Sequence, residues 1–153
     1  MISAMPEALE LVVGRPHGEH LTVHVTGRMH PEASDYWDGN WLISPITANL
    51  GSFTAHVNAG LRVEELRDFR LGLEQIQQQL RGEAALTSLD HWISLTVVCR
   101  PTGTLAIRGE LDDDSGAGNT LRFTIDGLDQ TDTPAMLSAL SAIDLAYPLL
   151  GRP

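Results

Sequence analysis

The feature that most constrains the fold of this chain is an alternation of apolar and polar residues with a period of two. Leu21, Val23 and Val25 alternate with histidines and threonines, a pattern typical of a β-strand with one face in water. Residues 9–14 predict a partner strand, because turn-forming residues separate the two segments. The alternation returns later and predicts further strands at residues 41–50, 53–59, 92–99, 105–111 and 121–125. Pro45 cannot donate to a ladder, so we expect an edge position or a bulge there.

Two segments have the spacing of a helix instead. The first carries five apolar residues on one stripe: Leu66, Phe69, Leu73, Ile76 and Leu80. Acidic residues precede this stripe and Gly82 follows it, which suits the two ends of a helix. The second helix is predicted over residues 133–147, with Thr133 as its N-cap and proline at the next position.

These segments predict one α+β domain over residues 1–153. Its sheet is expected to be largely antiparallel and meandering, with about eight strands and with two helices packed on one face. We expect the stripe of the first helix to be buried against apolar strand residues, which are Val23, Phe53, Val57, Leu95 and Ile107.

Composition narrows the function classes. The 153 residues include 20 acidic and 10 basic ones, for a net charge of −10, and every basic residue is an arginine. The absence of lysine excludes lysine-nucleophile and Schiff-base chemistry, and the acidic charge argues against binding of nucleic acid. No segment approaches the roughly 18 apolar residues of a membrane-spanning helix. The first basic residue is Arg15, and the single Cys99 can form no internal disulfide, so we expect a cytoplasmic protein without a signal peptide.

No motif indicates a catalytic centre, a cofactor or a metal. Walker, dinucleotide-binding and Gly-x-Ser-x-Gly patterns are absent from the sequence, and Cys99 lies on the apolar side of its strand. His20 and His24 share a strand face but are separated by about 13 Å, which is too far for two ligands of one zinc ion. His24 and His56 could meet across strands, but no further ligand joins them at a suitable spacing. An enzyme is possible on these residues alone, and the sequence offers no motif that supports one.

A polar loop begins with the three aspartates at 112–114 and resembles half of a calcium-binding loop. The EF-hand pattern requires Asp or Asn, Gly and Glu at the fifth, sixth and twelfth positions, where this chain has Gly116, Ala117 and Phe123. A solvated hairpin tip is the simpler interpretation, and its carboxylates could meet a basic partner.

The segment 35–42 is the most distinctive part of the sequence, because it holds three of the eight aromatic residues beside two acids. One interpretation is architectural, with a turn at residues 38–40 and with Trp41 anchoring the start of a strand. The other makes Tyr36 and Trp37 exposed anchors of a protein interface. The sequence favours the architectural role for Trp41 and leaves both roles open for Tyr36 and Trp37.

This segment resembles the bacterial WapI-like immunity proteins. A short acidic and aromatic lead precedes a match to the family's Asp-x-Asn-Trp-Leu motif, formed here by Asp38, Gly39, Asn40, Trp41 and Leu42. The order of elements is similar over most of the chain, including an amphipathic helix that opens near a Glu-Leu pair, here Glu65 and Leu66. The resemblance implies a non-catalytic protein that neutralises a co-encoded toxin by binding it, and such toxins are often nucleases with basic surfaces.

The acidic charge is compatible with that function, since an acidic inhibitor is steered toward a basic groove. The predicted partner-binding residues combine aromatic and acidic side chains in two loops: Asp35, Tyr36, Trp37, Asp38, Asp112, Asp113 and Asp114.

Two alternatives remain open at the level of the sequence. A small-ligand-binding or enzymatic domain would use a polar sheet face made of His20, Thr22, His24, His56, Asn58, Thr96, Arg108 and Arg122. A structural homo-oligomer would use the strand edge at Pro45 or the second helix as its interface.

Overall fold

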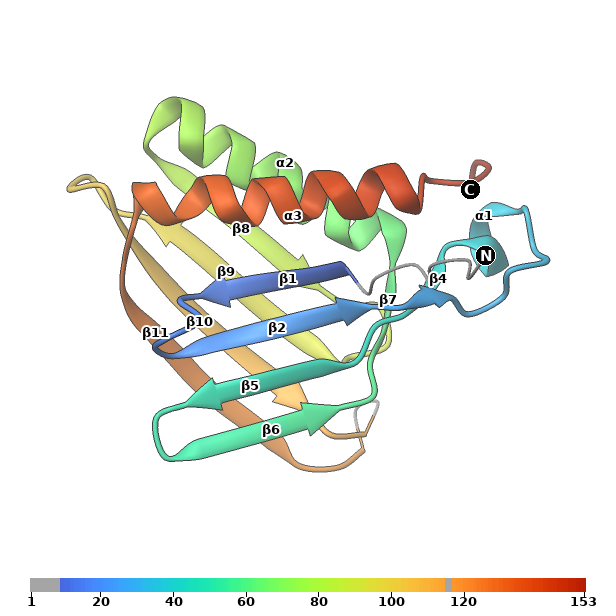
Figure 1. The fold of residues 1–153 in the computed structure, drawn as a ribbon, viewed down its shortest axis with the longest axis horizontal. Coiled ribbons are helices and arrows are strands. Elements are labelled where there is room, and N and C mark those ends of the chain that lie inside the picture. Colours follow the sequence, from blue (N-terminus) through green and yellow to red (C-terminus); the bar gives the residue numbers. More distant parts are fainter. Residues whose placement is uncertain (1–8, 115–116) are drawn as a thin grey trace, which may run out of the picture.

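A computed structural model describes residues 9–114 and 117–153 of the chain. Two four-stranded antiparallel sheets make up most of it, and Figure 1 shows one in front of the other. The first has the order β1-β2-β5-β6, with β1 at Leu9–Gly14, β2 at His20–Val25, β5 at Ile46–Leu50 and β6 at Phe53–Val57. The second has the order β11-β10-β9-β8, with β8 at Gly82–Thr87, β9 at Ile93–Cys99, β10 at Thr104–Asp112 and β11 at Thr120–Asp129.

A small third sheet and a short helix lie at one end of the molecule, at the right of Figure 1. The sheet has the order β3-β4-β7, with β3 at Gly27–Arg28, β4 at Trp41–Ile43 and β7 at Gly60–Arg62. The short helix α1, Tyr36–Gly39, lies between β3 and β4 in the sequence. The distinctive aromatic segment of the sequence is therefore part of this end.

Two long helices cover one edge of the pair of large sheets, as the upper part of Figure 1 shows. The helix α2, Val63–Gln79, packs against β8, and α3, Thr133–Ala146, packs against β1 after the 3-10 turn η1, Gln130–Asp132. A Cβ atom at Gly72 would lie 2.7 Å from the Cβ of Ala84, so the glycine permits the close approach of α2 to β8.

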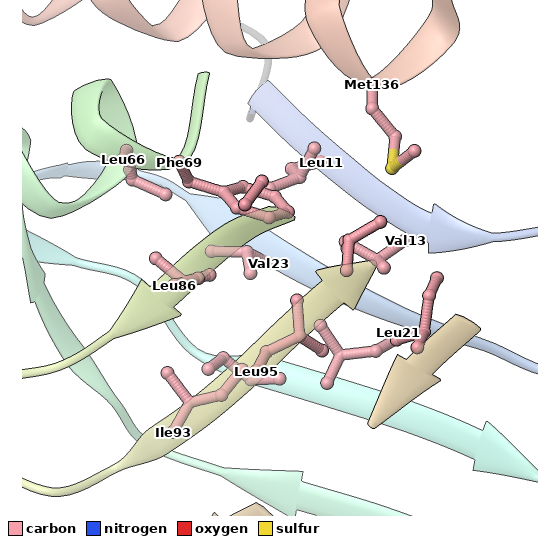
Figure 2. Close-up of a cluster of buried hydrophobic side chains, with 14 of the residues drawn as sticks. Leu11, Val13, Leu21, Val23, Leu66, Phe69, Leu86, Ile93, Leu95 and Met136 are labelled. Carbon is pink, nitrogen blue, oxygen red and sulfur yellow. The ribbon is translucent and has the colours of Figure 1, made fainter. Parts of the chain in front are cut away.

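The apolar faces of both large sheets and the stripes of both helices share one hydrophobic core. Figure 2 shows side chains from β1, β2, α2, β8, β9 and α3 pointing into the same space. The α+β class and the antiparallel pairing predicted from the sequence are confirmed. The described residues form eleven strands, however, and these are distributed over three sheets instead of one.

Most of the predicted core is confirmed, and two residues are corrections. Leu80 is 47% exposed and Phe53 is 64% exposed. The helix ends at Gln79, and Leu80 takes a left-handed conformation with φ 53°, which turns it away from the stripe. Phe53 begins the edge strand β6, which lies away from the edge that the helices cover.

The predicted strand 41–50 is broken by Pro45 into β4 and β5, which belong to different sheets. The carbonyl oxygen of Pro45 accepts a hydrogen bond of 2.9 Å from the backbone N–H of His24. The expected edge position is wrong, because β5 lies between β2 and β6 and β4 lies between β3 and β7. Instead of forming a bulge within one strand, the chain leaves one sheet and enters another at Pro45.

Candidate partner-binding surface

An aspartate cap stabilises the start of the short helix α1. The backbone N–H of Asp38 donates to the carboxylate of Asp35 over 3.1 Å, and the N–H of Gly39 donates to the carbonyl oxygen of Asp35 over 3.0 Å. Asp35 is thus the N-cap, a position at which aspartate is strongly preferred. The turn predicted at residues 38–40 is in fact the end of this helix.

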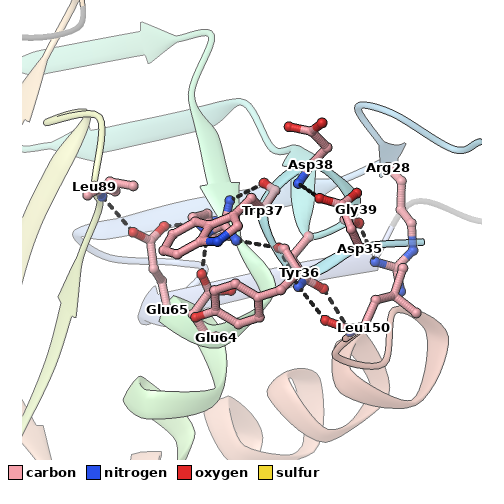
Figure 3. Close-up of polar contacts among 12 residues, drawn as sticks. Arg28, Asp35, Tyr36, Trp37, Asp38, Gly39, Glu64, Glu65, Leu89 and Leu150 are labelled. Atoms are coloured by element: carbon pink, nitrogen blue, oxygen red, sulfur yellow. Dashed lines mark hydrogen bonds and ion pairs between the residues drawn. The ribbon is translucent and has the colours of Figure 1, made fainter. Parts of the chain in front are cut away.

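A buried arginine holds α1 in place. Arg62 is 2% exposed, and its guanidinium donates to the carbonyl oxygens of Tyr36 over 2.7 Å and of Trp37 over 2.8 Å. It also forms an ion pair with Glu64. Figure 3 shows these contacts beside the first turn of α2. A buried cation is tolerated when its charge is paired and its N–H groups are bonded, and both conditions hold here.

Three aromatic rings surround the same guanidinium. Its central carbon lies 4.7 Å from the ring centroid of Trp41, 5.3 Å from that of Tyr36 and 5.6 Å from that of Trp37. The rings of Tyr36 and Trp37 meet edge to face, with centroids 4.9 Å apart and planes at 88°. Cation–π attraction of this kind adds to the hydrogen bonds, so Arg62 organises the aromatic segment.

Asn40 connects α1 to the last residues of the chain. Its side-chain N–H₂ donates to the carbonyl oxygens of Tyr36 and Leu150, each over 2.9 Å, and its side-chain oxygen accepts from the N–H of Leu150 over 2.9 Å. Asn40 is fully buried. This amide therefore joins two segments that are 110 residues apart in the sequence.

Arg28 and Gly39 complete that connection. The Arg28 guanidinium donates to the carbonyl oxygen of Gly39 over 2.8 Å and to that of Pro148 over 2.6 Å. A Cβ at Gly39 would lie 3.0 Å from a methyl group of Leu150, so the segment packs closely against glycine here. The motif at residues 38–42 is mostly architectural.

Two of the predicted partner-binding residues in this segment, Tyr36 and Trp37, now have different environments. Tyr36 is half-buried and its ring packs against the Arg62 guanidinium, whereas the side chain of Trp37 is 57% exposed. Asp35 and Asp38 are both exposed. A surface hollow of about 490 Å³ lies beside α1, lined by Met29, His30, Pro31, Glu32, Ala33 and Asp38.

The predicted residues at 112–114 are held by local hydrogen bonds. The carboxylate of Asp113 accepts from the backbone and side-chain N–H groups of Asn119 over 2.7 and 3.0 Å, and these bonds lower the pKa of Asp113. Asp112 accepts from the hydroxyl of Thr120 over 2.6 Å, while Asp114 is exposed. Gly116, which entered the comparison with calcium loops, lies outside the described residues, as do the first eight residues of the chain.

The structure does not bring the two predicted segments together. In Figure 1 the loop after β10 lies near the lower end of the sheets, away from α1. A hollow of about 270 Å³ joins this loop to β6 instead, with Phe53 and Asp113 among its lining residues. In the described part of the chain, no hydrogen bond or ion pair links α1 to residues 112–114.

Sequence reasoning missed a further carboxylate beside α1. Glu65 accepts hydrogen bonds from the backbone N–H groups of Arg62 over 2.7 Å and of Leu89 over 2.6 Å. Burial raises the pKa of Glu65 to about 7, although these two hydrogen bonds act in the opposite direction. The hydrogen bond to Glu65 holds the backbone of Leu89 beside the first turn of α2. The side chain of Leu89 is 57% exposed, so it is another large exposed apolar group besides Trp37.

The role of Arg62 was also missed. Arg62 precedes α2 at a position where Ser, Thr, Asp or Asn is usual. An arginine directly before the first predicted helix, with two glutamates at 64 and 65, is the sequence signal that could have indicated a different function for this side chain.

The prediction that these eight polar residues share one sheet face is wrong. Its histidines lie on the first large sheet, whereas Thr96, Arg108 and Arg122 lie on the second. Because the apolar faces of both sheets share one core, their polar faces point away from each other. A hollow of about 610 Å³ on the second face includes both arginines, and Arg122 is paired with Glu110 at 2.8 Å.

The histidines have separate partners. His24 contacts Glu10 at 3.3 Å and Thr47 at 2.9 Å, while His56 contacts Asn58 at 3.1 Å. Over residues 9–114 and 117–153, no three His, Cys, Asp or Glu side chains are grouped so that they could hold a metal ion. Within the same residues, no helix is both long and apolar enough to cross a membrane.

Comparison with known proteins supplies a family. No curated protein matches the sequence. One similar solved structure is that of MRP1/MRP2 from Trypanosoma bruciei, with 13% sequence identity, a TM-score of 0.49, and coverage of 95% of this chain and 88% of that one. The model of the immunity protein WapI-like family matches residues 12–148, as the motif at residues 38–42 predicted. The chain therefore belongs to the immunity protein WapI-like family, a class associated with toxin neutralisation in general.

Proposed function

We propose that this protein neutralises a cognate toxin by binding it, without catalysis, through the surface that α1 presents. The observation that carries the proposal is the contrast at Trp37, whose side chain is 57% exposed while its carbonyl oxygen is held by the buried Arg62. Tryptophan is enriched among the residues that dominate binding energy in protein interfaces.

The fixed backbone at Trp37 supports this role. Binding becomes weaker when a loop must be ordered as it meets its partner, so a residue that is already in place avoids that cost. Asp35 caps the start of α1. Hydrogen bonds from Arg28 of β3, Arg62 of β7 and Asn40 at the end of α1 fix its backbone. Trp37 can therefore offer a large apolar ring at little entropic expense.

The charge around α1 suits a basic partner. Asp35, Asp38 and Glu32 are exposed, and Asp38 and Glu32 both line the neighbouring hollow of about 490 Å³. A basic side chain of the toxin would fit this hollow, and a nuclease with a basic substrate groove is the class of toxin that we favour. The chain's net charge of −10 would speed the encounter.

Residues Asp112, Asp113 and Asp114 form the second part of the proposed surface. They lie apart from α1, so we assign them to long-range attraction of the toxin and not to direct support of Trp37. We also propose that the protein acts in the cytoplasm as a single domain, which agrees with its one free and buried cysteine, Cys99.

The test is surface plasmon resonance against the toxin domain that membership of this family leads us to expect in a neighbouring gene. Trp37→Ala should speed dissociation and weaken binding by about 2 kcal/mol or more, as for an interface anchor. Leu71→Ala is the matched control, because Leu71 of α2 is a large apolar residue of similar exposure, 52%, and lies outside both parts of the proposed surface. Binding that survives Trp37→Ala unchanged would eliminate α1 as the site and would favour the hollow near Arg108.

A further inference from the structure

We infer that Arg62 is a positioning residue for partner binding: it sets the place of Trp37 from inside the protein and does not touch the partner. The inference rests on the proposed function, since it concerns the same surface. It adds a residue that lies outside the motif at 38–42 and outside both segments predicted from the sequence.

The first step concerns accessibility. Arg62 is 2% exposed and is covered by the rings of Tyr36, Trp37 and Trp41. A partner that docks on α1 would meet these rings and not the guanidinium beneath them. Any effect of Arg62 on binding must therefore pass through the residues that it holds.

The second step concerns the weakness of α1 by itself. A helix of four residues is far shorter than the roughly 12–15 residues at which isolated helices become marginally stable. The last carbonyl groups of any helix lack partners within that helix. Here Arg62 supplies donors to the carbonyl oxygens of both Tyr36 and Trp37, so the position of the helix depends on this side chain.

The third step concerns the chemistry that the position requires. The planar guanidinium donates to two carbonyl oxygens and also pairs with Glu64, through separate N–H groups. A lysine ammonium keeps the charge but is a compact group without the same fork, so it cannot reproduce this set of contacts. Arg62→Lys should thus disturb geometry while the charge of the site is preserved.

A matched control is present on α2, the helix that directly follows Arg62. Arg67 on α2 pairs with Asp144 of α3 at 3.6 Å and is 39% exposed, so it links two helices, and in the described part of the chain it forms no hydrogen bond or ion pair with α1. Arg67→Lys makes the same chemical change without touching the segment that carries Trp37. A general effect of replacing an arginine by lysine in or next to α2 would appear in both variants.

The first measurement needs no partner. Nitrogen-15 relaxation of the Trp37 indole N–H, assigned by comparison with Trp37→Phe, reports the order of that side chain. Arg62→Lys should shift this resonance and increase its motion, whereas Arg67→Lys should leave it unchanged. An indole that keeps its shift and order in a folded Arg62→Lys protein would overturn the inference.

The second measurement is a double-mutant cycle with the same toxin domain that is used to test the proposed function. Arg62→Lys should raise the dissociation rate by about tenfold or more, and it should add little once Trp37 is already alanine, because the two residues act as one unit. Equal losses in both backgrounds would show that Arg62 acts independently of Trp37 and would overturn the inference. Loss of affinity in neither single variant would instead contradict the proposed function, whereas loss in Trp37→Ala alone would contradict only the inference.

Discussion

The two segments that the sequence singled out for partner binding, α1 and the loop after β10, are held by different means. Arg28 of β3, Arg62 of β7 and the Asn40–Leu150 pair fix α1, so its supports come from residues scattered over the chain. In the loop, Asp113 bonds to Asn119 and Asp112 to Thr120, which are its near neighbours across the hairpin. Both segments carry exposed aspartates, but they form two different kinds of surface.

The difference suggests a division of roles. An exposed side chain on a firmly supported backbone can serve as an anchor, because its position is set before the partner arrives. Exposed carboxylates at a hairpin tip act mainly through their charge, which changes the rate of encounter more than the lifetime of a complex. The following predictions test whether α1 and the loop after β10 separate in this way.

The largest effect is expected when the support beneath α1 loses its charge. Arg62→Met should lower the free energy of unfolding by about 3–5 kcal/mol, because the carboxylate of Glu64 would remain partly buried without its partner. Urea denaturation followed by circular dichroism measures this change. Arg67→Met, at a more exposed ion pair, should cost much less. Equal losses in these two variants would mean that the contacts of Arg62 are not special.

A smaller loss is expected at the amide that joins α1 to the end of the chain. Asn40→Ala removes three hydrogen bonds and should cost about 1–3 kcal/mol, since the partly buried backbone N–H and carbonyl groups of Leu150 would both lose their partner. Asn49→Ala is the control, because Asn49 is exposed and has only a long contact of 3.4 Å with His20. The same denaturation series compares them, and a stable Asn40→Ala protein would show that α1 does not need this connection.

The contrast between near and distant contacts also explains what the sequence could predict. Strand β9 and the stripe of α2 follow from periodicity, because alternate residues of one segment face one core. The function of Arg62 does not follow, since its carbonyl partners lie 25 and 26 residues away and no period relates them.

Other errors have the same origin. Strand β8 has little intrinsic strand signal in its Gly-Glu-Ala-Ala start, and it forms between β9 and α2 through tertiary contacts. Phe53 matches the alternation of β6 but lies at an open edge, which a pattern within one strand cannot reveal. In the segment that forms α1, the sequence left Tyr36 and Trp37 as equal candidates for an exposed anchor, because no pattern indicates which of the two rings is buried.

A third prediction uses pH to distinguish the two regions. The pKa of Glu65 is raised from 4.5 to about 7 by burial, so the folded state binds more protons than the unfolded state between these values. The free energy of unfolding should therefore fall as the pH rises through this window. Asp113 has a lowered pKa, and its contribution is present at neutral pH and is lost only as the pH falls below its ordinary value of 3.8.

Denaturation at pH 5 and pH 8 gives the required comparison. Glu65→Gln should flatten the dependence between these pH values, because the titrating group is gone. Glu74→Gln, a half-exposed position farther along α2, should keep the slope of the parent protein. A parent protein whose stability does not change over this interval would show that the environment of Glu65 is less restrictive than its burial indicates.

The smallest effect on stability is expected at the hairpin tip. Replacement of Asp112, Asp113 and Asp114 by serine should leave the melting temperature nearly unchanged, since the tip is exposed and contributes little to the core. Association with the toxin domain should slow by an amount on the order of tenfold at low salt, and the salt dependence of the association rate should flatten. The dissociation rate should remain that of the parent, in contrast to Trp37→Ala. Faster dissociation with an unchanged association rate would mean that the tip makes close contacts in the complex, and the separation between an anchoring α1 and a steering loop would then fail.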